Sequence, residues 1–119
     1  KDWGKYDGCL REAIRLDPSL DKAWLRLGYL HIDKGEEYFA KVIELRPENP
    51  QPYYWIAYND CRDGKIEKSI ARFKKYLEVA KTDHPEESGR ILTAKHFIKQ
   101  MESGITDYHQ IVQNEVNET

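Results

Sequence analysis

The side chains that most often perform catalysis or bind metal ions are few in this sequence and lie far apart. Four histidines are spread along the chain: His31, His84, His96 and His109. No two of them are four residues apart, and none belongs to the His and Glu pattern of a zinc-binding helix. Two cysteines, Cys9 and Cys61, are too few for a metal cluster or a disulfide framework, so we expect buried free thiols rather than a disulfide or a reactive thiol. These residues predict no metal site and no cofactor.

Nucleophilic catalysis and phosphate binding are also poorly supported. Cys61 lies between Asp60 and Arg62, a charged setting that can lower a thiol pKa, but no nearby histidine supplies a general base. Gly35 and Gly64 are spaced as turns between helices and not as a phosphate-binding loop. We therefore predict that the chain is not an enzyme.

The length and the charge of the chain exclude further classes of function. A chain of 119 residues and 14.1 kDa has room for one ordinary domain. Its net charge of -2 and pI of about 6.1 offer no bulk attraction for nucleic acid or anionic lipid. No apolar run approaches the roughly 18 residues that span a bilayer, so we expect a soluble protein without membrane insertion. Cytoplasmic localisation is slightly favoured, but because the sequence begins at Lys1 and not at Met, a removed leader and secretion stay open.

A repeated spacing of residues indicates how the chain is organised. One pattern occurs twice, 29 residues apart: Trp24-x2-Leu27-Gly28-x2-His31-x3-Gly35 and Tyr53-x2-Ile56-Ala57-x2-Asp60-x3-Gly64. Small residues stand at Gly28 and Ala57, where two helices of a hairpin must approach closely. We expect the matching positions to form a core and not a site.

Each unit of this pattern predicts two helices separated by a glycine, because apolar residues recur at helical spacing and prolines mark stops and starts. The expected helices cover residues 20–34, 36–45, 51–62 and 66–81. Two more are expected beyond Pro85, the last at about residues 107–116.

The spacing resembles the tetratricopeptide repeat. Trp24, Leu27 and Gly28 match its W-x2-L-G opening, and Ser69 with Phe73 matches its later A-x3-F with serine for alanine. The resemblance covers residues 4–81 and implies an all-α fold, an α-solenoid of antiparallel helical hairpins with a C-terminal capping helix pair. It divides a single domain, 1–119, into a partial repeat (1–18), two repeats (19–47 and 48–81) and capping helices (85–119). His31 and Asp60 depart from the family pattern, which usually has tyrosine at those positions.

The resemblance also implies a concave groove lined by the first helix of each hairpin. The groove residues expected here are Lys22, Leu25, Tyr29, Ile32, Gln51, Tyr54, Tyr58 and Arg62. Apolar groups that a stack leaves uncovered are candidates for a partner surface, and tyrosine gives a large contact area. The alternative is that neighbouring helices or the capping pair cover these side chains. The Lys, Arg and Asn side chains with which some family members hold a C-terminal carboxylate are absent, so that ligand is not expected.

The resulting functional prediction is a non-enzymatic scaffold that binds a protein or peptide in this groove, without a cofactor and without nucleic acid. Two alternatives stay open. One is self-assembly into a homo-oligomer through an exposed N-terminal helix, and the other is a regulatory or targeting role within a larger protein.

One spacing differs between the two repeats. Gly64 to Phe73 spans nine positions, whereas Gly35 to Phe39 spans four. Either the second helix of the earlier repeat is shortened by more than a turn, or residues are missing between Gly35 and Glu36. We favour the second interpretation and expect a Cα separation there clearly larger than the roughly 3.8 Å of a bonded pair.

Overall fold

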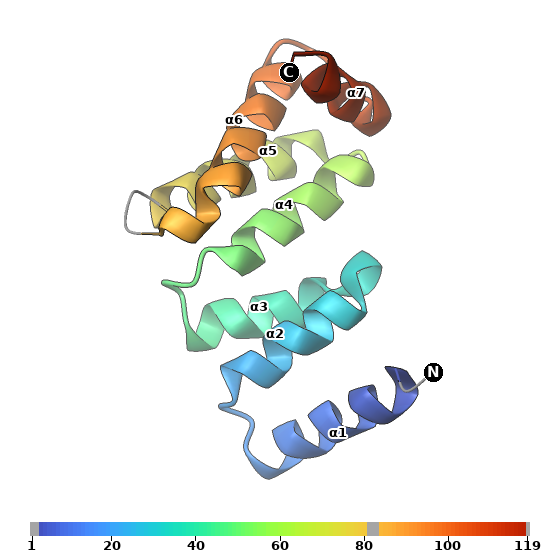
Figure 1. Cartoon of the computed structure of the whole chain (residues 1–119), viewed down its shortest axis with the longest axis vertical. Coiled ribbons are helices and arrows are strands. Elements are labelled where there is room, and N and C mark those ends of the chain that lie inside the picture. Colours follow the sequence, from blue (N-terminus) through green and yellow to red (C-terminus); the bar gives the residue numbers. More distant parts are fainter. Residues whose placement is uncertain (1–2, 81–83, 119) are drawn as a thin grey trace. The chain divides into compact units, whose positions relative to one another are not determined.

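The fold is all-α, as the sequence predicts. A computed structural model describes residues 3–80 and 84–118, and within these ranges it contains helices and no strand (Figure 1). The α-helices are α1 (Trp3–Leu16), α2 (Asp21–Leu30), α3 (Glu36–Leu45), α4 (Gln51–Arg62), α5 (Ile66–Ala80), α6 (Ser88–Glu102) and α7 (Tyr108–Glu118). Two short 3₁₀ turns, Ile32–Lys34 and Pro85–Glu87, precede α3 and α6. None of the helices among the described residues is long and apolar enough to cross a bilayer.

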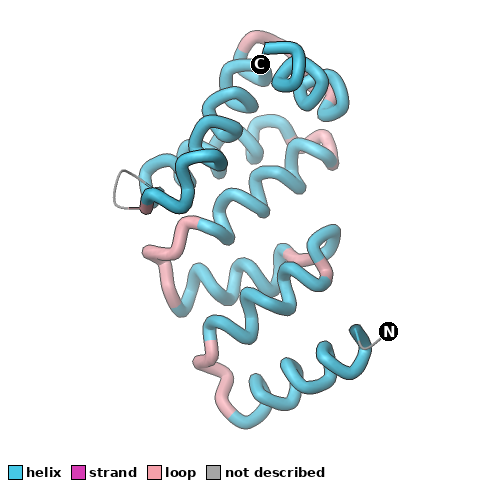
Figure 2. The backbone as a smooth tube through the Cα atoms, in the orientation of Figure 1, coloured by secondary structure: helices cyan, strands magenta, loops and turns pink. Residues whose placement is uncertain are grey.

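The helices divide into two compact units, which are described separately. The first unit extends to Pro52 and contains α1, α2 and α3, and the second begins at Tyr53 and contains most of α4 with α5, α6 and α7. Short loops join α1 to α2 in the first unit, and α4 to α5 and α6 to α7 in the second (Figure 2).

The first unit is built around the α2–α3 hairpin, whose helices lie side by side (Figure 1). Phe39 of α3 is fully buried, and a Cβ atom added to Gly28 of α2 would come within 2.5 Å of its ring. Glycine at position 28 therefore lets the two helices approach at the distance that the Phe39 ring requires. Helix α1 packs on α2 through a small apolar cluster whose buried members are Leu10, Ala23 and Leu27.

The connection between α2 and α3 is continuous, and the predicted break at Gly35 is wrong for this structure. Lys34 N–H donates to the His31 carbonyl at 2.8 Å, and Phe39 N–H donates to the Gly35 carbonyl at 2.8 Å. The shortened helix accounts for the spacing, because α3 has 10 residues where its counterpart α5 has 15. The expected 20–34 helix also stops early at Leu30, since the short connection tightens its end into a 3₁₀ turn.

The second unit packs α5 between α4 and α6. The Ser69 hydroxyl of α5 is fully buried and donates to the Ala57 carbonyl of α4 at 2.7 Å, which explains how serine substitutes for a small apolar residue there. Phe73 of α5 and Phe97 of α6 are buried with ring centroids 5.4 Å apart. Helix α7 packs on α6 and buries Ile111 completely.

The turn between α4 and α5 depends on Gly64, which has a positive φ of 82°. Gly64 N–H donates to the Cys61 carbonyl at 3.1 Å, and Lys65 N–H donates to the Asp60 carbonyl at 2.8 Å, which is the Schellman arrangement of a helix end. The expected boundaries of α4 therefore agree with the structure. The expected end of the next helix at Lys81 lies outside the described residues.

Candidate functional site

Three of the expected groove residues, Lys22, Leu25 and Tyr29, lie on α2, and a fourth, Ile32, begins the 3₁₀ turn that follows it. Leu25, Tyr29 and Ile32 follow the helical i, i+4, i+7 spacing and are half-buried, and Lys22 beside them is exposed. The opposite face of the same helix buries Ala23 and Leu27. Helix α2 therefore fills the core with one apolar face and leaves a second one half-buried. We call Lys22, Leu25 and Tyr29 of α2, together with Ile32 of the 3₁₀ turn, the α2 surface.

Tyr29 is held in place from two sides. Its ring meets the buried Phe39 ring edge-on, with centroids 5.7 Å apart and an interplanar angle of 70°. Its hydroxyl donates to the Gln51 side-chain carbonyl. Gln51 is itself positioned because Asn49 accepts its backbone N–H at 3.1 Å and caps α4. The structure thus brings together Tyr29 and Gln51, two residues of the expected groove.

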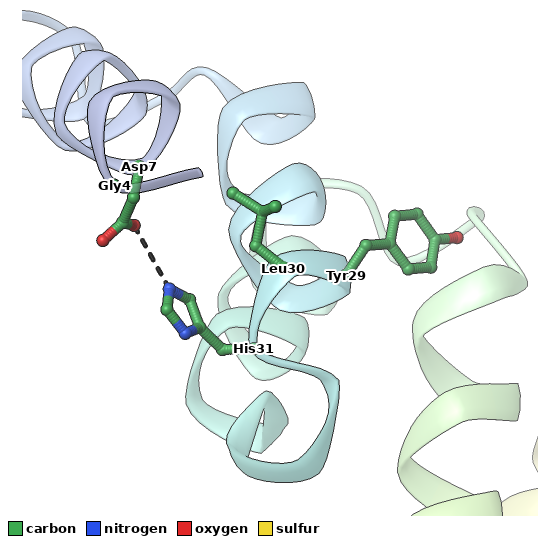
Figure 3. Close-up of a pocket in the computed structure, with 5 residues that line it drawn as sticks. All are labelled: Gly4, Asp7, Tyr29, Leu30 and His31. Carbon is green, nitrogen blue, oxygen red and sulfur yellow. Dashed lines mark hydrogen bonds and ion pairs between the residues drawn. The ribbon is translucent and has the colours of Figure 1, made fainter. Parts of the chain in front are cut away.

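A hollow of about 430 Å³ opens beside this helix, between α1 and the end of α2. It is lined by Gly4, Asp7, Tyr29, Leu30 and His31 (Figure 3). His31 Nε2 lies 3.2 Å from Asp7 Oδ1, and because a carboxylate accepts, the imidazole N–H donates. Tyr29 points away from this pair, so its hydroxyl does not join it (Figure 3).

The Asp7 carboxylate has a second partner, the cation Arg11. Arg11 Nε donates to both of its oxygens at 3.1 Å, and Arg11 Nη2 donates to the Tyr38 hydroxyl at 2.6 Å. The hydrogen bond from His31, followed by those from Arg11, holds the pKa of Asp7 below its ordinary value. The network links α1, the end of α2 and α3, and we interpret it as a structural connection between these helices.

The structure gives a reason for histidine at position 31. The family pattern places tyrosine there, and the sequence alone did not identify a partner for the substituted residue. The sequence feature that indicates such a partner is a polar side chain on an otherwise apolar helix face. A polar group of this kind requires a hydrogen-bond partner when it packs against a neighbouring helix.

Tyr54, by contrast, lies in the interior of the second unit. It is 5% exposed, and its ring packs against Phe73 and Tyr76 of α5 at centroid distances of 5.8 and 5.2 Å. The Arg90 guanidinium of α6 lies 6.0 Å from the ring centroid. Burial raises the pKa of Tyr54 to about 12.

Tyr58 is covered in the same way by the C-terminal helices. Its ring lies 5.4 Å from Phe97 of α6 and 5.4 Å from Tyr108 of α7, and the two tyrosine hydroxyls are 2.7 Å apart. Burial, followed by the bond to Tyr108, raises the pKa of Tyr58. Neighbouring helices thus cover both side chains: Tyr54 is buried against α5, and Tyr58 is half-buried against α6 and α7.

Arg62, the last expected groove residue, is exposed at the end of α4. Its Nη2 donates to Asn59 Oδ1 at 2.9 Å. Arg62 therefore presents its charge at the surface, whereas Tyr54 and Tyr58 of the same helix face inward.

The two cysteines differ from each other. Cys61 is a buried thiol, and burial raises its pKa to about 11, which makes it a poor nucleophile. Cys9 is exposed, so the expectation that both thiols are buried is wrong for it. It precedes Leu10, the residue of α1 that packs on α2. Among the described residues no cluster of three or more His, Cys, Asp or Glu side chains could hold a metal ion.

A curated protein to which this chain is similar is Superkiller protein 3 of Saccharomyces cerevisiae, with 27% identity over 86 residues. The match covers 68% of this chain and 6% of that protein, so the chain spans a small part of the length of the relative. No protein-family model matches the sequence. No solved structure matches it. The distant similarity and the all-helical structure are both compatible with a helical repeat of the tetratricopeptide type.

Proposed function

We propose that this chain is a tetratricopeptide-like, non-enzymatic module that binds a protein or peptide partner through the α2 surface. The observation that carries the proposal is the stripe of Leu25, Tyr29 and Ile32, which stays half-exposed although the other face of α2 is fully used in packing. Tyrosine is among the residues that contribute most to binding energy at protein interfaces, and the buried centre of an interface is largely apolar.

The support of Tyr29 fits this role. Its ring rests on Phe39 and its hydroxyl is bound by Gln51, so the side chain is already ordered before a partner arrives. An ordered side chain loses little conformational entropy on binding, which favours affinity. Lys22, beside the stripe, is an exposed cation that would meet acidic side chains of a partner.

The remaining expected groove residues have supporting roles in this proposal. Gln51 positions Tyr29, Tyr54 packs α4 on α5, and Tyr58 packs α4 on α6. The repeat division, with a partial repeat at 1–18, repeats at 19–47 and 48–81 and a cap at 85–119, is part of the same proposal. It is supported by the recurrence of the small-residue helix contact at Gly28 and Ala57.

Self-assembly is the second candidate, because α1 exposes apolar side chains. Tyr6 is 40% and Leu16 is 71% exposed, and both lie on α1. A second copy of the chain could cover them, and the experiment below separates the two functions.

Site-specific photo-crosslinking tests the proposal. A benzophenone amino acid replaces exposed Lys22, next to the stripe, and as a control it replaces exposed Glu44 on α3. We expect cells expressing the Lys22 variant to yield a crosslinked protein, identified by mass spectrometry, that the Glu44 variant does not yield. Leu25→Lys should reduce binding of that purified protein at least about tenfold with unchanged helicity.

Two results would contradict the proposal. Crosslinking of a second copy of this chain would show self-assembly instead. An identical set of crosslinked proteins from Lys22 and Glu44 would show that the α2 surface has no preferred partner.

A further inference from the structure

The second unit has an open groove on its surface between α5 and α6, away from the aromatic interior that holds Tyr54 and Tyr58. Two adjoining hollows of about 510 and 520 Å³ share Leu77 of α5 and Lys95 of α6 in their linings, so they are treated together. We call it the α5–α6 groove.

Apolar side chains of both helices line the groove. Leu77 of α5 and Ile91 of α6 are half-buried, Ile98 of α6 is nearly buried, and Leu92 of α6 is 68% exposed. An exposed leucine next to partly covered aliphatic residues is a patch that water contacts and that a partner could cover.

Lysines dominate the charged side chains of the groove. Among the described residues, Lys74, Lys95 and Lys99 line it with one carboxylate, Glu102. That carboxylate pairs with Lys74 at 2.8 Å. In the part of the chain that the structure describes, Lys95 and Lys99 form no ion pair, so two positive charges stand uncompensated beside the apolar lining of a chain whose net charge is -2.

We propose that the α5–α6 groove binds an acidic amphipathic helix of another protein. The lining residues of α6 recur at Ile91, Lys95, Ile98 and Glu102, which is one face of that helix over about three turns, or roughly 16 Å. A partner helix of similar length would place apolar residues at i, i+3, i+4 and i+7 on Leu77, Ile91 and Leu92. Its flanking carboxylates would meet Lys95 and Lys99.

Charge complementarity and the apolar lining together favour a peptide over nucleic acid. Binding of single strands relies on aromatic side chains that stack on bases and on a dense track of cations. The described lining has no Phe, Tyr or Trp, and its free charge is limited to two lysines. The α5–α6 groove shares no residue with the α2 surface, so each binding proposal is tested independently of the other.

The test uses a labelled synthetic peptide of 15 residues, with leucine at the i, i+3, i+4, i+7 positions and glutamate at most others. Fluorescence anisotropy measures its binding to the whole chain, and a second peptide carries glutamine in place of every glutamate. We expect the acidic peptide to bind and the neutral peptide to bind at least about tenfold more weakly.

Variants of the protein locate the binding site. Lys95→Glu with Lys99→Glu should weaken acidic-peptide binding at least about tenfold, and Leu92→Asn should weaken it at least about fivefold. The matched control is Lys65→Glu with Lys68→Glu, which changes the net charge equally at exposed positions near the start of α5. This control should retain binding within about twofold. All altered side chains are exposed, so circular dichroism should show unchanged helicity.

Several outcomes would overturn the proposal. One is that the two double-lysine variants weaken acidic-peptide binding equally. Another is that the acidic peptide does not bind at concentrations up to about 1 mM. A third is that a uridine oligonucleotide binds more tightly than the peptide. Concentration-dependent dimerisation that Leu92→Asn abolishes would assign the groove to a second copy of the chain instead.

Discussion

Arg72 Nη1 of α5 donates to the buried carboxylate of Asp60 on α4 at a distance of 2.6 Å. The Asp60 side chain is 3% exposed, whereas that of Arg72 is 35% exposed. Asp60 is one of the two positions at which the sequence departs from the family tyrosine, and the other, His31, also has a partner, Asp7, on a neighbouring helix. Both departures are thus matched by an oppositely charged or hydrogen-bonding side chain.

The Asp60–Arg72 pair predicts an asymmetric mutational effect. Arg72→Ala should destabilise the fold by about 3–5 kcal/mol, because it leaves a buried carboxylate without its cation. Asp60→Ala should cost only about 1–3 kcal/mol, because the half-exposed guanidinium can turn to water. Urea unfolding measures both values, and equal costs would contradict the interpretation. The double variant Asp60→Leu with Arg72→Met should recover much of the loss, since a well-packed apolar pair can replace an ion pair.

Replacing Gly28 should cause a steric clash, and replacing Gly8 provides the matched control. Gly28→Ala should destabilise the chain by about 1–3 kcal/mol, because its Cβ would overlap the ring of the fully buried Phe39. Gly8→Ala, inside α1 with no atom within 4 Å of the added Cβ, should instead stabilise it by about 0.5–1 kcal/mol. Thermal and urea unfolding of the two variants should shift in opposite directions. A neutral Gly28→Ala would show that α2 and α3 do not pack as described.

Substitution of Tyr54 should lower the stability of the fold and should not weaken partner binding selectively. Tyr54→Ala should cost about 3–5 kcal/mol, because a buried ring in contact with Phe73 and Tyr76 is removed. Leu25→Ala on the α2 surface should cost about 1 kcal/mol, because its side chain is only half-buried. The melting temperatures of Tyr54→Ala and Leu25→Ala, measured under the same conditions, test this expectation. An unchanged melting temperature for Tyr54→Ala would return that residue to the exposed groove of the sequence prediction.

The shifted pKa values of the tyrosines predict sensitivity to alkali. Burial raises the pKa of Tyr54 to about 12 and also raises those of Tyr58 and Tyr76, so the folded state keeps protons that the unfolded chain releases near pH 10. Stability from these groups is therefore complete below about pH 10 and falls as pH rises toward 12, by at most about 1.4 kcal/mol per pH unit for each tyrosine. Cys61 adds a change of the same sign from about pH 9, since its pKa is raised to about 11.

Unfolding free energies measured from pH 8 to 11.5 test this expectation. Above pH 10 the free energy of unfolding should fall less steeply with pH for Tyr54→Phe than for the unmodified chain. Both proteins contain Cys61, so its contribution is the same in each. Parallel curves for the two proteins would contradict the role of Tyr54, and absorbance of tyrosinate reports ionisation directly.

The sequence by itself determined the helices and their order. Helical spacing and proline or glycine punctuation act over a few residues, so the bounds of α3 and α4 could be predicted from the local pattern alone. The repeat of Trp24 to Gly35 at Tyr53 to Gly64 likewise identified Gly28 and Ala57 as contact points between paired helices, which the structure confirms.

Only the tertiary structure decided what covers each second apolar face. Leu25 and Tyr54 hold corresponding positions on α2 and α4, yet Leu25 is half-exposed and Tyr54 is buried beneath contacts from α5 and α6. Helical periodicity gives the direction of a side chain on its own helix, but burial depends on helices that arrive from distant parts of the chain. The partners of His31 and Asp60 were undetermined for the same reason: Asp7 and Arg72 lie on other helices, and no local spacing links them.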